Sequence, residues 1–284
     1  MPANLLQALA RIVQQPIPNL KDVTSAKNRA NSLGVSLEEY IKDAFADTFH
    51  TSDAQARLNK LAGTFSYLGS QNNPPDMMLR GGDAIEVKKI TARNADLALN
   101  SSYPKTQLMR DNPMLTKECR QCEWWQEKDL IYAVGLVDKS QLSALAFVYG
   151  IDYVASAPTY ERIKASMSTG IASIPEVEFA PTNELGRVNK VDPLGNTYLR
   201  IRGMWHISNP WRSFDYLPQP PTHAAFSLMA IINDEKFLAF PQNDRNALLA
   251  LTVDHPTLNI ANVVIKEPDD PSQTKSAKLI TLYL

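Results

Sequence analysis

The chain has 284 residues, of which 44% are hydrophobic and 21% are charged. These fractions are ordinary for a globular protein and exclude a wholly disordered chain, and this length can bury a sizeable core without disulfides or bound metal. The 29 basic and 30 acidic residues give a net charge of −1, which excludes a uniformly basic surface but leaves room for a basic face.

The longest apolar runs cover residues 130–137 and 144–151. A membrane helix needs about 20 apolar residues, so we expect no membrane span. The N-terminus lacks a basic lead, an apolar block and a cleavage site, and it predicts an amphipathic helix rather than a signal peptide. Two cysteines do not make a disulfide framework, and we expect a protein of the reducing cytoplasm.

Helical patterns dominate the first quarter of the chain. Apolar residues recur at helical spacing over residues 5–13 and again over 52–61. Between these stretches, the pattern predicts a helix over 36–49. Ser36 is its expected N-cap, and Glu39 is the expected partner in a capping box.

A cluster rich in Asn and Pro at 71–75 marks a change from helical to strand patterns. Beyond it, short apolar segments predict strands, two of them joined by a Gly-Gly turn into a β-hairpin. The predicted strands are 76–79 and 84–90 in the hairpin, then 130–137, 142–149 and 278–284.

Helices, then strands, then a further helix at about 160–171 predict an α/β fold with a mixed central β-sheet flanked by helices. The strands at 130–137 and 142–149 are continuously apolar, which suits burial on both faces. Residues 186–221 are rich in loops and prolines. Since no clean linker is present, we expect one domain with a long insertion.

The hairpin is the stretch that carries chemistry. Side chains alternate along a strand, so Ile85 and Val87 face a core, and Glu86 and Lys88 share the other face with Asp76 alongside. Carboxylates hold Mg²⁺ for phosphodiester hydrolysis, and an ammonium beside the metal orients water or stabilises developing charge. The alternative is a solvated strand in which acidic and basic residues alternate without a catalytic role.

The helix before the hairpin offers a further carboxylate. Glu38 lies just beside the apolar stripe that contains Leu37 and Ile41. From that position a carboxylate can reach a metal held on the adjacent sheet. The alternative is an ordinary solvated glutamate.

Together, Gly34, Glu38, Asp76, Glu86 and Lys88 resemble the core of the PD-(D/E)xK nucleases. Longer blocks resemble the NgoPII family of type II restriction endonucleases, and they cover most of the chain between residues 34 and 206. These blocks are 36–43, 65–69, 71–76, 82–90, 100–105 and 186–195.

The resemblance implies a PD-(D/E)xK endonuclease fold, Mg²⁺-dependent cleavage of double-stranded DNA at GGCC and a cognate DNA methyltransferase. Cutting both strands of a palindrome suggests a two-fold symmetric homodimer. Carried over residue by residue, the implied catalytic residues are Asp76, Glu86, Lys88 and Glu38, and the implied metal-site residues are Asp76, Glu86, Val87 and Glu38.

Basic residues concentrate in residues 88–110 and 186–212, each with five basic residues and one acidic residue, whereas acidic residues predominate from residue 213 onward. This segregation predicts one DNA-facing side. Arginine paired to guanine is the commonest base contact at a G·C site, although any one arginine can instead contact phosphate or form a salt bridge. The predicted DNA contacts are Lys89, Ser101, Ser102, Lys105, Arg187, Asn189, Lys190, Arg200 and Arg202.

The expected parts of the domain follow from these assignments. They are the helical segment 1–66, the catalytic core 67–175, the DNA-recognition region 186–221 and the C-terminal part 222–284, which completes the fold or supplies the dimer surface. Two other functions stay open: a repair or structure-specific nuclease with the same core, and a DNA-binding protein with an inactive core.

Other motifs carry less weight. Cys119 and Cys122 form a C-x-x-C, but a structural zinc needs four ligands and no second such pair is present. Trp124 and Trp125 are expected to pack rather than to stack on bases. Asp83 is expected to be a turn residue.

Overall fold

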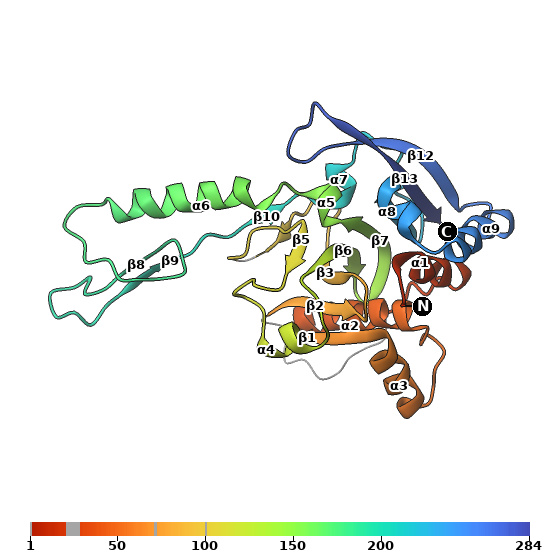
Figure 1. Ribbon diagram of the computed structural model, residues 1–284, viewed down its shortest axis with the longest axis horizontal. Coiled ribbons are helices and arrows are strands. Elements are labelled where there is room, and N and C mark those ends of the chain that lie inside the picture. Colours follow the sequence, from red (N-terminus) through yellow and green to blue (C-terminus); the bar gives the residue numbers. More distant parts are fainter. Residues whose placement is uncertain (1, 21–28, 71–72, 100) are drawn as a thin grey trace.

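The computed structural model describes residues 2–20, 29–70, 73–99 and 101–284 (Figure 1). Gln71 and Asn72 of the turn-rich cluster, and Asn100 of the 100–105 block, lie outside the described residues. The helices are α1 (Leu5–Gln14), α2 (Arg29–Ala46), α3 (Ala54–Thr64), α4 (Lys117–Gln121), α5 (Gly150–Tyr153), α6 (Ala157–Ala172), α7 (Pro210–Ser213), α8 (Asp234–Ala239) and α9 (Gln242–Asp254).

The strands build one large mixed sheet and two small ribbons. The strands are β1 (Phe65–Ser70), β2 (Asn73–Leu79), β3 (Ala84–Ile90), β4 (Leu97–Ala98), β5 (Gln107–Met109), β6 (Glu127–Asp138), β7 (Gln141–Tyr149), β8 (Gly186–Val188), β9 (Leu199–Ile201), β10 (His206–Ile207), β11 (Ser227–Asn233), β12 (Asn259–Lys266) and β13 (Thr274–Tyr283).

The large sheet has the strand order β1-β2-β3-β6-β7-β11-β13-β12, with β5 paired to β6 at the side. The β3–β6 and β7–β11 pairs are parallel, and the other neighbours are antiparallel. The predicted α/β class with a mixed central sheet is therefore confirmed. The predicted hairpin is confirmed too, since Met77 pairs with Ile85 and Met78 with Ala84.

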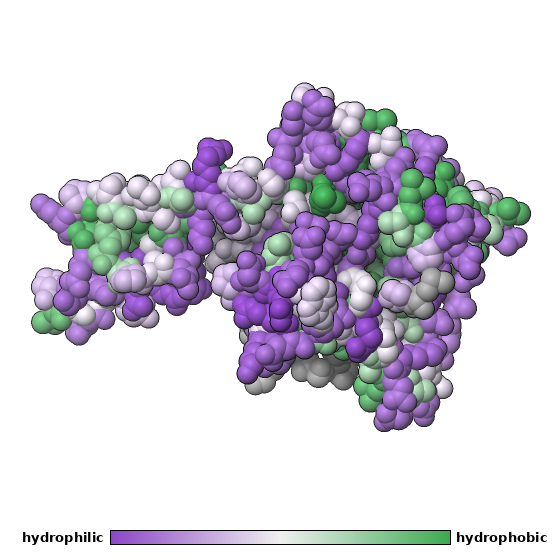
Figure 2. Space-filling model, viewed as in Figure 1, coloured by the Kyte–Doolittle hydropathy of each residue, from purple (hydrophilic) through white to green (hydrophobic). Residues whose placement is uncertain are grey.

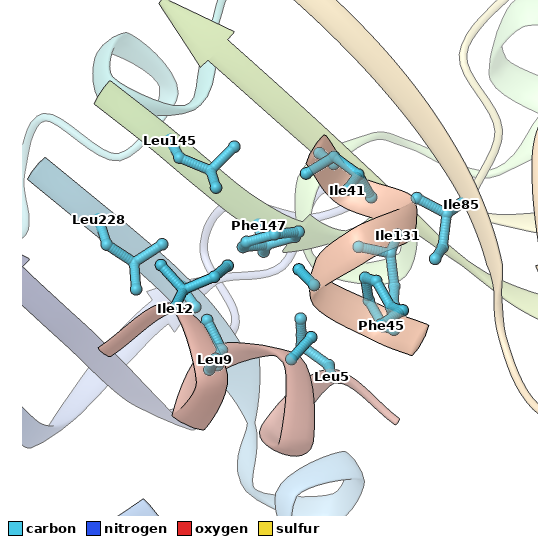
Figure 3. Close-up of a cluster of buried hydrophobic side chains, with 14 of the residues drawn as sticks. Leu5, Leu9, Ile12, Ile41, Phe45, Ile85, Ile131, Leu145, Phe147 and Leu228 are labelled. Carbon is cyan, nitrogen blue, oxygen red and sulfur yellow. The ribbon is translucent and has the colours of Figure 1, made fainter. Parts of the chain in front are cut away.

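Helices α1 and α2 cover one face of the sheet, as Figure 3 shows. Their apolar stripes pack against the side chains of β3, β6, β7 and β11 that point to this face. A second core lies on the opposite face, beneath α4, α7 and the connecting loops. The side chains labelled in Figure 3 are Leu5, Leu9, Ile12, Ile41, Phe45, Ile85, Ile131, Leu145, Phe147 and Leu228.

The start of α2 differs from the prediction. The helix begins at Arg29, so Ser36 lies inside it and is buried, and it is not an N-cap. Glu39 instead forms ion pairs with Lys42 and Arg57, at 2.8 and 2.7 Å. Since a serine or glycine inside a helix costs about 1 kcal/mol or less relative to alanine, packing of the apolar stripe overrides the local helix-start signal at Ser36.

Strand β2 begins earlier than predicted. It starts at Asn73, within the turn-rich cluster, where Asn73 pairs with Ser70 of β1. On its other side, β2 pairs with β3 only through Met77 and Met78. Proline lacks an N–H, so it is tolerated where no ladder bond is required. Pro74 and Pro75 precede the part of β2 that is paired with β3, which explains how they fit in a strand.

Helix α6 and the β8–β9 ribbon project from the body of the molecule as an arm (Figure 1). No residue of α6 is buried, so this helix belongs with the arm rather than with the sheet, in contrast to the expected boundary at residue 175. Figure 2 shows apolar side chains (green) exposed on the arm; those more than half exposed include Met167, Val191, Leu194, Tyr198 and Met204. In the described part of the chain, no helix is long and apolar enough to cross a membrane.

Candidate active site

The β2–β3 hairpin brings Asp76, Glu86 and Lys88 together as the alternation predicted. Ile85 and Val87 are buried in the core on the helical side. The Lys88 Nζ atom lies 2.6 Å from Oε1 of Glu86. The Asp76 Oδ2 atom accepts a 2.6 Å hydrogen bond from the Val87 backbone N–H. The three polar side chains line one cavity of about 490 Å³.

The electrostatics of this group show how closely its charges lie. Burial and, to a lesser extent, the neighbouring Glu86 carboxylate together raise the pKa of Asp76 to about 8, against the opposing effect of Lys88. Burial opposes the charge on Lys88, but Glu86 and Asp76 more than compensate, so the pKa of Lys88 is raised. Both shifts follow from two carboxylates and one ammonium held together away from solvent.

Glu38 joins the group from α2. Its pKa is raised, chiefly by burial, and the charges of Lys42, Lys88 and Glu86 also act on it. The helix therefore places this carboxylate within electrostatic range of the hairpin, as its position beside the apolar stripe indicated. Glu38 is partly buried, unlike an ordinary solvated glutamate.

The donor set suits a hard divalent cation. Asp76 and Glu86 repel one another, and a bound cation would relieve this repulsion. Among the described residues, no three His, Cys, Asp or Glu side chains lie close enough together to hold a metal ion, so Glu38 does not form a three-carboxylate site with Asp76 and Glu86. Mg²⁺ does not require one, because it is commonly held by one or two carboxylates with waters and substrate oxygens. The side chain of Val87 is packed in the core, so only its backbone carbonyl could take part.

Gly69 keeps Asp76 in place from the neighbouring strand. A Cβ atom at residue 69 would lie 2.2 Å from the carbonyl oxygen of Pro75 and 3.2 Å from that of Asp76. Real Cβ atoms essentially never approach another atom as closely as 2.2 Å, so β1 can lie this close to the β2–β3 hairpin only with glycine at that position. The absence of a side chain at residue 69 thereby allows β1 to pack directly against the backbone at Pro75 and Asp76.

The 101–105 loop lies at the same cavity. Ser101, Ser102 and Lys105 are among the residues that line it. The Lys105 ammonium donates to Oγ of Ser102 and, at 3.3 Å, to the carbonyl oxygen of Tyr103. Burial lowers the pKa of Lys105, and Glu86 partly offsets this effect. Lys89 is not among the lining residues, because strand alternation turns it away from the face of Lys88.

The arm reaches the cavity through Arg202 and Glu184, which both line it. Arg200 binds Glu184 through Nε and Nη2, at 2.9 and 2.8 Å, and Arg202 also donates to Glu184. Sequence reasoning missed Glu184, because no local pattern connects it with arginines 16 and 18 residues away. Arg200 and Arg202 therefore lie on the same side of the arm, since both contact this carboxylate.

The other predicted contacts on the arm lie away from the cavity. Arg187 pairs with Arg200 across the β8–β9 ribbon, and its guanidinium lies 5.2 Å from the Tyr198 ring centroid. Lys190 forms an exposed ion pair with Glu178 at 3.2 Å. The backbone N–H of Asn189 donates to the carbonyl of Glu178.

Two features of minor weight differ from expectation. Trp125 is buried, but Trp124 is 84% exposed, so the predicted packing role is wrong for Trp124. Asp83 is more than a turn residue, because it is buried, pairs with Lys236 at 2.8 Å and accepts from the Tyr149 hydroxyl. Whether a side chain is exposed or buried depends on segments that meet only in the folded chain. The local sequence therefore could not predict the exposure of Trp124 or the burial of Asp83.

The cysteine pair sits in the second core. Cys119 is buried, with its Sγ atom 3.5 Å from Sδ of Met78, and Cys122 is partly buried. Burial raises the pKa of the Cys119 thiol to about 12. Since the thiolate is the reactive and metal-binding form, this environment favours a packing role for Cys119.

Two comparisons with known proteins, by family and by individual relative, point to the same family. Residues 3–266 match the family described as NgoPII restriction endonuclease. The chain is 47% identical, over 282 residues, to the protein named Type II restriction enzyme NgoPII from Neisseria gonorrhoeae, with 99% of this chain and 100% of that protein covered. No solved structure matches the chain.

Proposed function

The chain belongs to the NgoPII restriction endonuclease family, and from this premise we propose that it is a type II restriction endonuclease. It hydrolyses phosphodiester bonds in double-stranded DNA in a Mg²⁺-dependent reaction. The observation that carries the proposal is the cavity whose wall presents Asp76, Glu86 and Lys88 from one hairpin. Two carboxylates and an ammonium at one point are what metal-assisted phosphodiester hydrolysis needs.

In this proposal Asp76 and Glu86 would hold Mg²⁺ together with the Val87 carbonyl, and Glu38 would assist from α2. When bound there, the metal would polarise a phosphoryl oxygen and lower the pKa of a water. Lys88 orients the attacking water, a role supported by its 2.6 Å contact with Glu86. The raised pKa of Lys88 keeps it positively charged at neutral pH, so it can also stabilise negative charge on the phosphate.

We further propose that the fold is of the PD-(D/E)xK class. The hairpin that carries the carboxylates, the parallel neighbour β6 and the glutamate on α2 support this assignment. We propose one endonuclease domain, since a single sheet takes strands from residue 65 to residue 283. The arm and the 101–105 loop then form the DNA-recognition surface beside the catalytic cavity.

We propose GGCC as the recognition site, as the sequence resemblance implies. Arg187, Arg200 and Arg202 are the candidate guanine readers, since bidentate arginine suits guanine O6 and N7. Lys105, Ser101 and Ser102, with Lys190 and Asn189 on the arm, are the candidate phosphate contacts. A palindromic site cut on both strands requires two active sites, so we propose a homodimer, with a cognate methyltransferase that protects host DNA in the cytoplasm.

The decisive test is a digest of a long, fully sequenced linear DNA with the wild-type protein, in Mg²⁺ and in EDTA, followed by mapping of the ends. We expect discrete fragments that end at GGCC in Mg²⁺ and no cleavage in EDTA. Discrete ends at another palindrome would retain the restriction chemistry but reject GGCC. Cleavage only of branched or damaged DNA would favour a repair nuclease, and binding without cleavage would favour an inactive core.

Arg202 offers a test of recognition. Because it lines the cavity, Arg202→Ala is expected to lower cleavage at the specific site about 10- to 100-fold, the value of a bidentate guanine contact. Affinity for a random duplex should change much less. Competition binding with specific and random duplexes, beside single-turnover cleavage, provides the measurement. Lys60→Ala, which removes a positive charge from an exposed position of α3, away from the arm, is the control; equal losses on both duplexes would show that Arg202 contacts phosphate.

A further inference from the structure

We propose that Lys105 is a second catalytic lysine, which binds a non-bridging oxygen of the phosphate being cleaved, and that Tyr132 positions it from β6. The inference rests on the proposed nuclease function and adds two roles to it. Lys105 contributes positive charge to the transition state rather than general affinity for DNA. Tyr132, which no sequence pattern pointed to, sets the place of that charge.

Lys105 differs from Lys88 in its partners. Lys88 pairs with the Glu86 carboxylate. In contrast, within the described residues Lys105 forms no ion pair with a carboxylate, and its ammonium donates to the neutral oxygens of Ser102 and Tyr103. Removing an ammonium from water without an opposite charge is costly, so the location of Lys105 suits an anion that arrives from outside.

The anion that fits is a phosphodiester at the carboxylate site. Lys105 lines the same cavity as Asp76 and Glu86, and its charge acts electrostatically with Glu86 and Lys88. A phosphate bound in this cavity would lie within reach of both the carboxylates that would hold the metal and the Lys105 ammonium. The substrate therefore supplies the negative partner that the free protein lacks.

Tyr132 holds the backbone of Lys105 on both sides. Its hydroxyl accepts a 2.9 Å hydrogen bond from the Lys105 N–H and donates a 3.1 Å hydrogen bond to the Lys105 carbonyl. Tyr132 is buried, and it pairs directly with Glu86 in the β3–β6 register. One side chain of the sheet thus fixes the loop lysine relative to the strand that carries the catalytic carboxylate.

Gly150, the first residue of α5, confines the same backbone from another side. It follows β7, and a Cβ atom there would lie 2.4 Å from the carbonyl oxygen of Lys105 and 2.5 Å from that of Thr106. The loop is therefore seated against a glycine, where no side chain separates it from the sheet. Such preorganisation is what makes a charge effective in the transition state, because no reorganisation is needed when the reaction occurs.

The chemical step is balanced without proton transfer by Lys105. The oxygen of one water bonds to phosphorus, the bond from phosphorus to the leaving oxygen breaks, and the leaving oxygen takes a proton as the water releases one. Lys105 keeps its protons throughout. Its contribution is to stabilise the charge that develops on the non-bridging oxygens.

The test compares Lys105→Met, Lys105→Arg and Tyr132→Phe in single-turnover cleavage and in duplex binding with EDTA. We expect Lys105→Met to lower the cleavage rate about 100- to 1,000-fold, the usual effect of removing one preorganised charge donor, with less than a tenfold change in binding. Lys105→Arg should cleave at least tenfold faster than Lys105→Met. Tyr132→Phe should lower the rate about tenfold, and should have no further effect when combined with Lys105→Met.

Tyr153→Phe is the matched control. Tyr153 is a neighbouring, partly buried tyrosine, with its ring centroid 5.5 Å from that of Tyr132, and its hydroxyl donates to the carbonyl of Ser208 rather than to Lys105. We expect this variant to lose thermal stability as Tyr132→Phe does, with cleavage within twofold of wild type. Equal rate losses in both tyrosine variants would assign Tyr132 a structural role only and overturn its positioning role.

The results also separate this inference from the proposed function. If wild type cleaves and Lys105→Met cleaves within threefold of it, the nuclease stands and the inference is overturned. An additive effect of Tyr132→Phe in the Lys105→Met background overturns the positioning role of Tyr132. A wild-type protein that cleaves no DNA overturns the proposed function and, with it, the role of Lys105.

Discussion

Glu86→Gln is expected to abolish DNA cleavage, with a single-turnover rate at least about 1,000-fold below wild type. The change removes one of two carboxylates that would hold the metal, and the partner that Lys88 binds at 2.6 Å. Loss of metal-based stabilisation of the transition state is worth several kcal/mol, and about 4 kcal/mol corresponds to this factor. Cleavage is measured with excess protein over a duplex that contains one site.

Binding and a matched variant complete this experiment. Glu86→Gln should bind duplex at least as tightly as wild type, because one negative charge is removed beside the phosphate site. Glu127→Gln, the same substitution at an exposed position on β6, should cleave like wild type. A Glu86→Gln protein that cleaves within tenfold of wild type would reject the hairpin as the catalytic site.

Asp76→Asn is expected to remove the dependence of the protein's thermal stability on Mg²⁺ and the part of its pH dependence that comes from Asp76. In the metal-free protein the pKa of Asp76 is raised to about 8 from an ordinary value of 3.8. Between these values the folded state binds more protons than the unfolded state, so the contribution of Asp76 to stability falls as pH rises from about 4 to 8. Asparagine carries no charge and can still accept from the Val87 N–H, so the variant should be more stable than wild type near pH 8.

Thermal unfolding at pH 6 and pH 8.5, in EDTA and in Mg²⁺, measures this effect. Mg²⁺ should raise the melting temperature of wild type at pH 8.5, since a ligand that binds only the folded state stabilises it, and should leave Asp76→Asn unchanged. Below pH 8, protons compete for Asp76, so the Mg²⁺ concentration needed for half-maximal cleavage should rise about tenfold per pH unit. Asp254→Asn, at an exposed helical position, should behave as wild type in every condition. A wild-type protein whose melting temperature does not respond to Mg²⁺ would contradict the assigned metal site.

Sequence periodicity was sufficient to predict the arrangement of side chains where the contacts involved are between residues close in sequence. The alternation of Ile85, Glu86, Val87 and Lys88 determines which side chains share a face, because successive residues of a strand point to opposite sides. The turn at 80–83 then brings Asp76 alongside, since a short hairpin connection pairs its own flanking strands. The arrangement of the hairpin and the face shared by Glu86 and Lys88 were accordingly predictable from about 15 consecutive residues.

Contacts between distant segments were not predictable in this way. The Tyr132 hydroxyl meets the Lys105 backbone 27 positions away in sequence, and Glu184 gathers Arg200 and Arg202 from across a ribbon. The exposure of Trp124 and the burial of Asp83 likewise depend on which segments cover them. Patterns within a single sequence do not indicate which distant residues come into contact.

Local residue patterns were therefore enough to predict the main polar groups of the candidate site: two carboxylates, one ammonium and a nearby helix glutamate. The groups that surround them depend on how distant segments pack in the fold. The parallel pairing of β3 with β6 places Tyr132 opposite Glu86, and the path of the chain between these strands carries the 101–105 loop over the cavity. The physical reason is that periodicity specifies the face on which a side chain lies, whereas strand order and loop path specify its neighbours across the sheet.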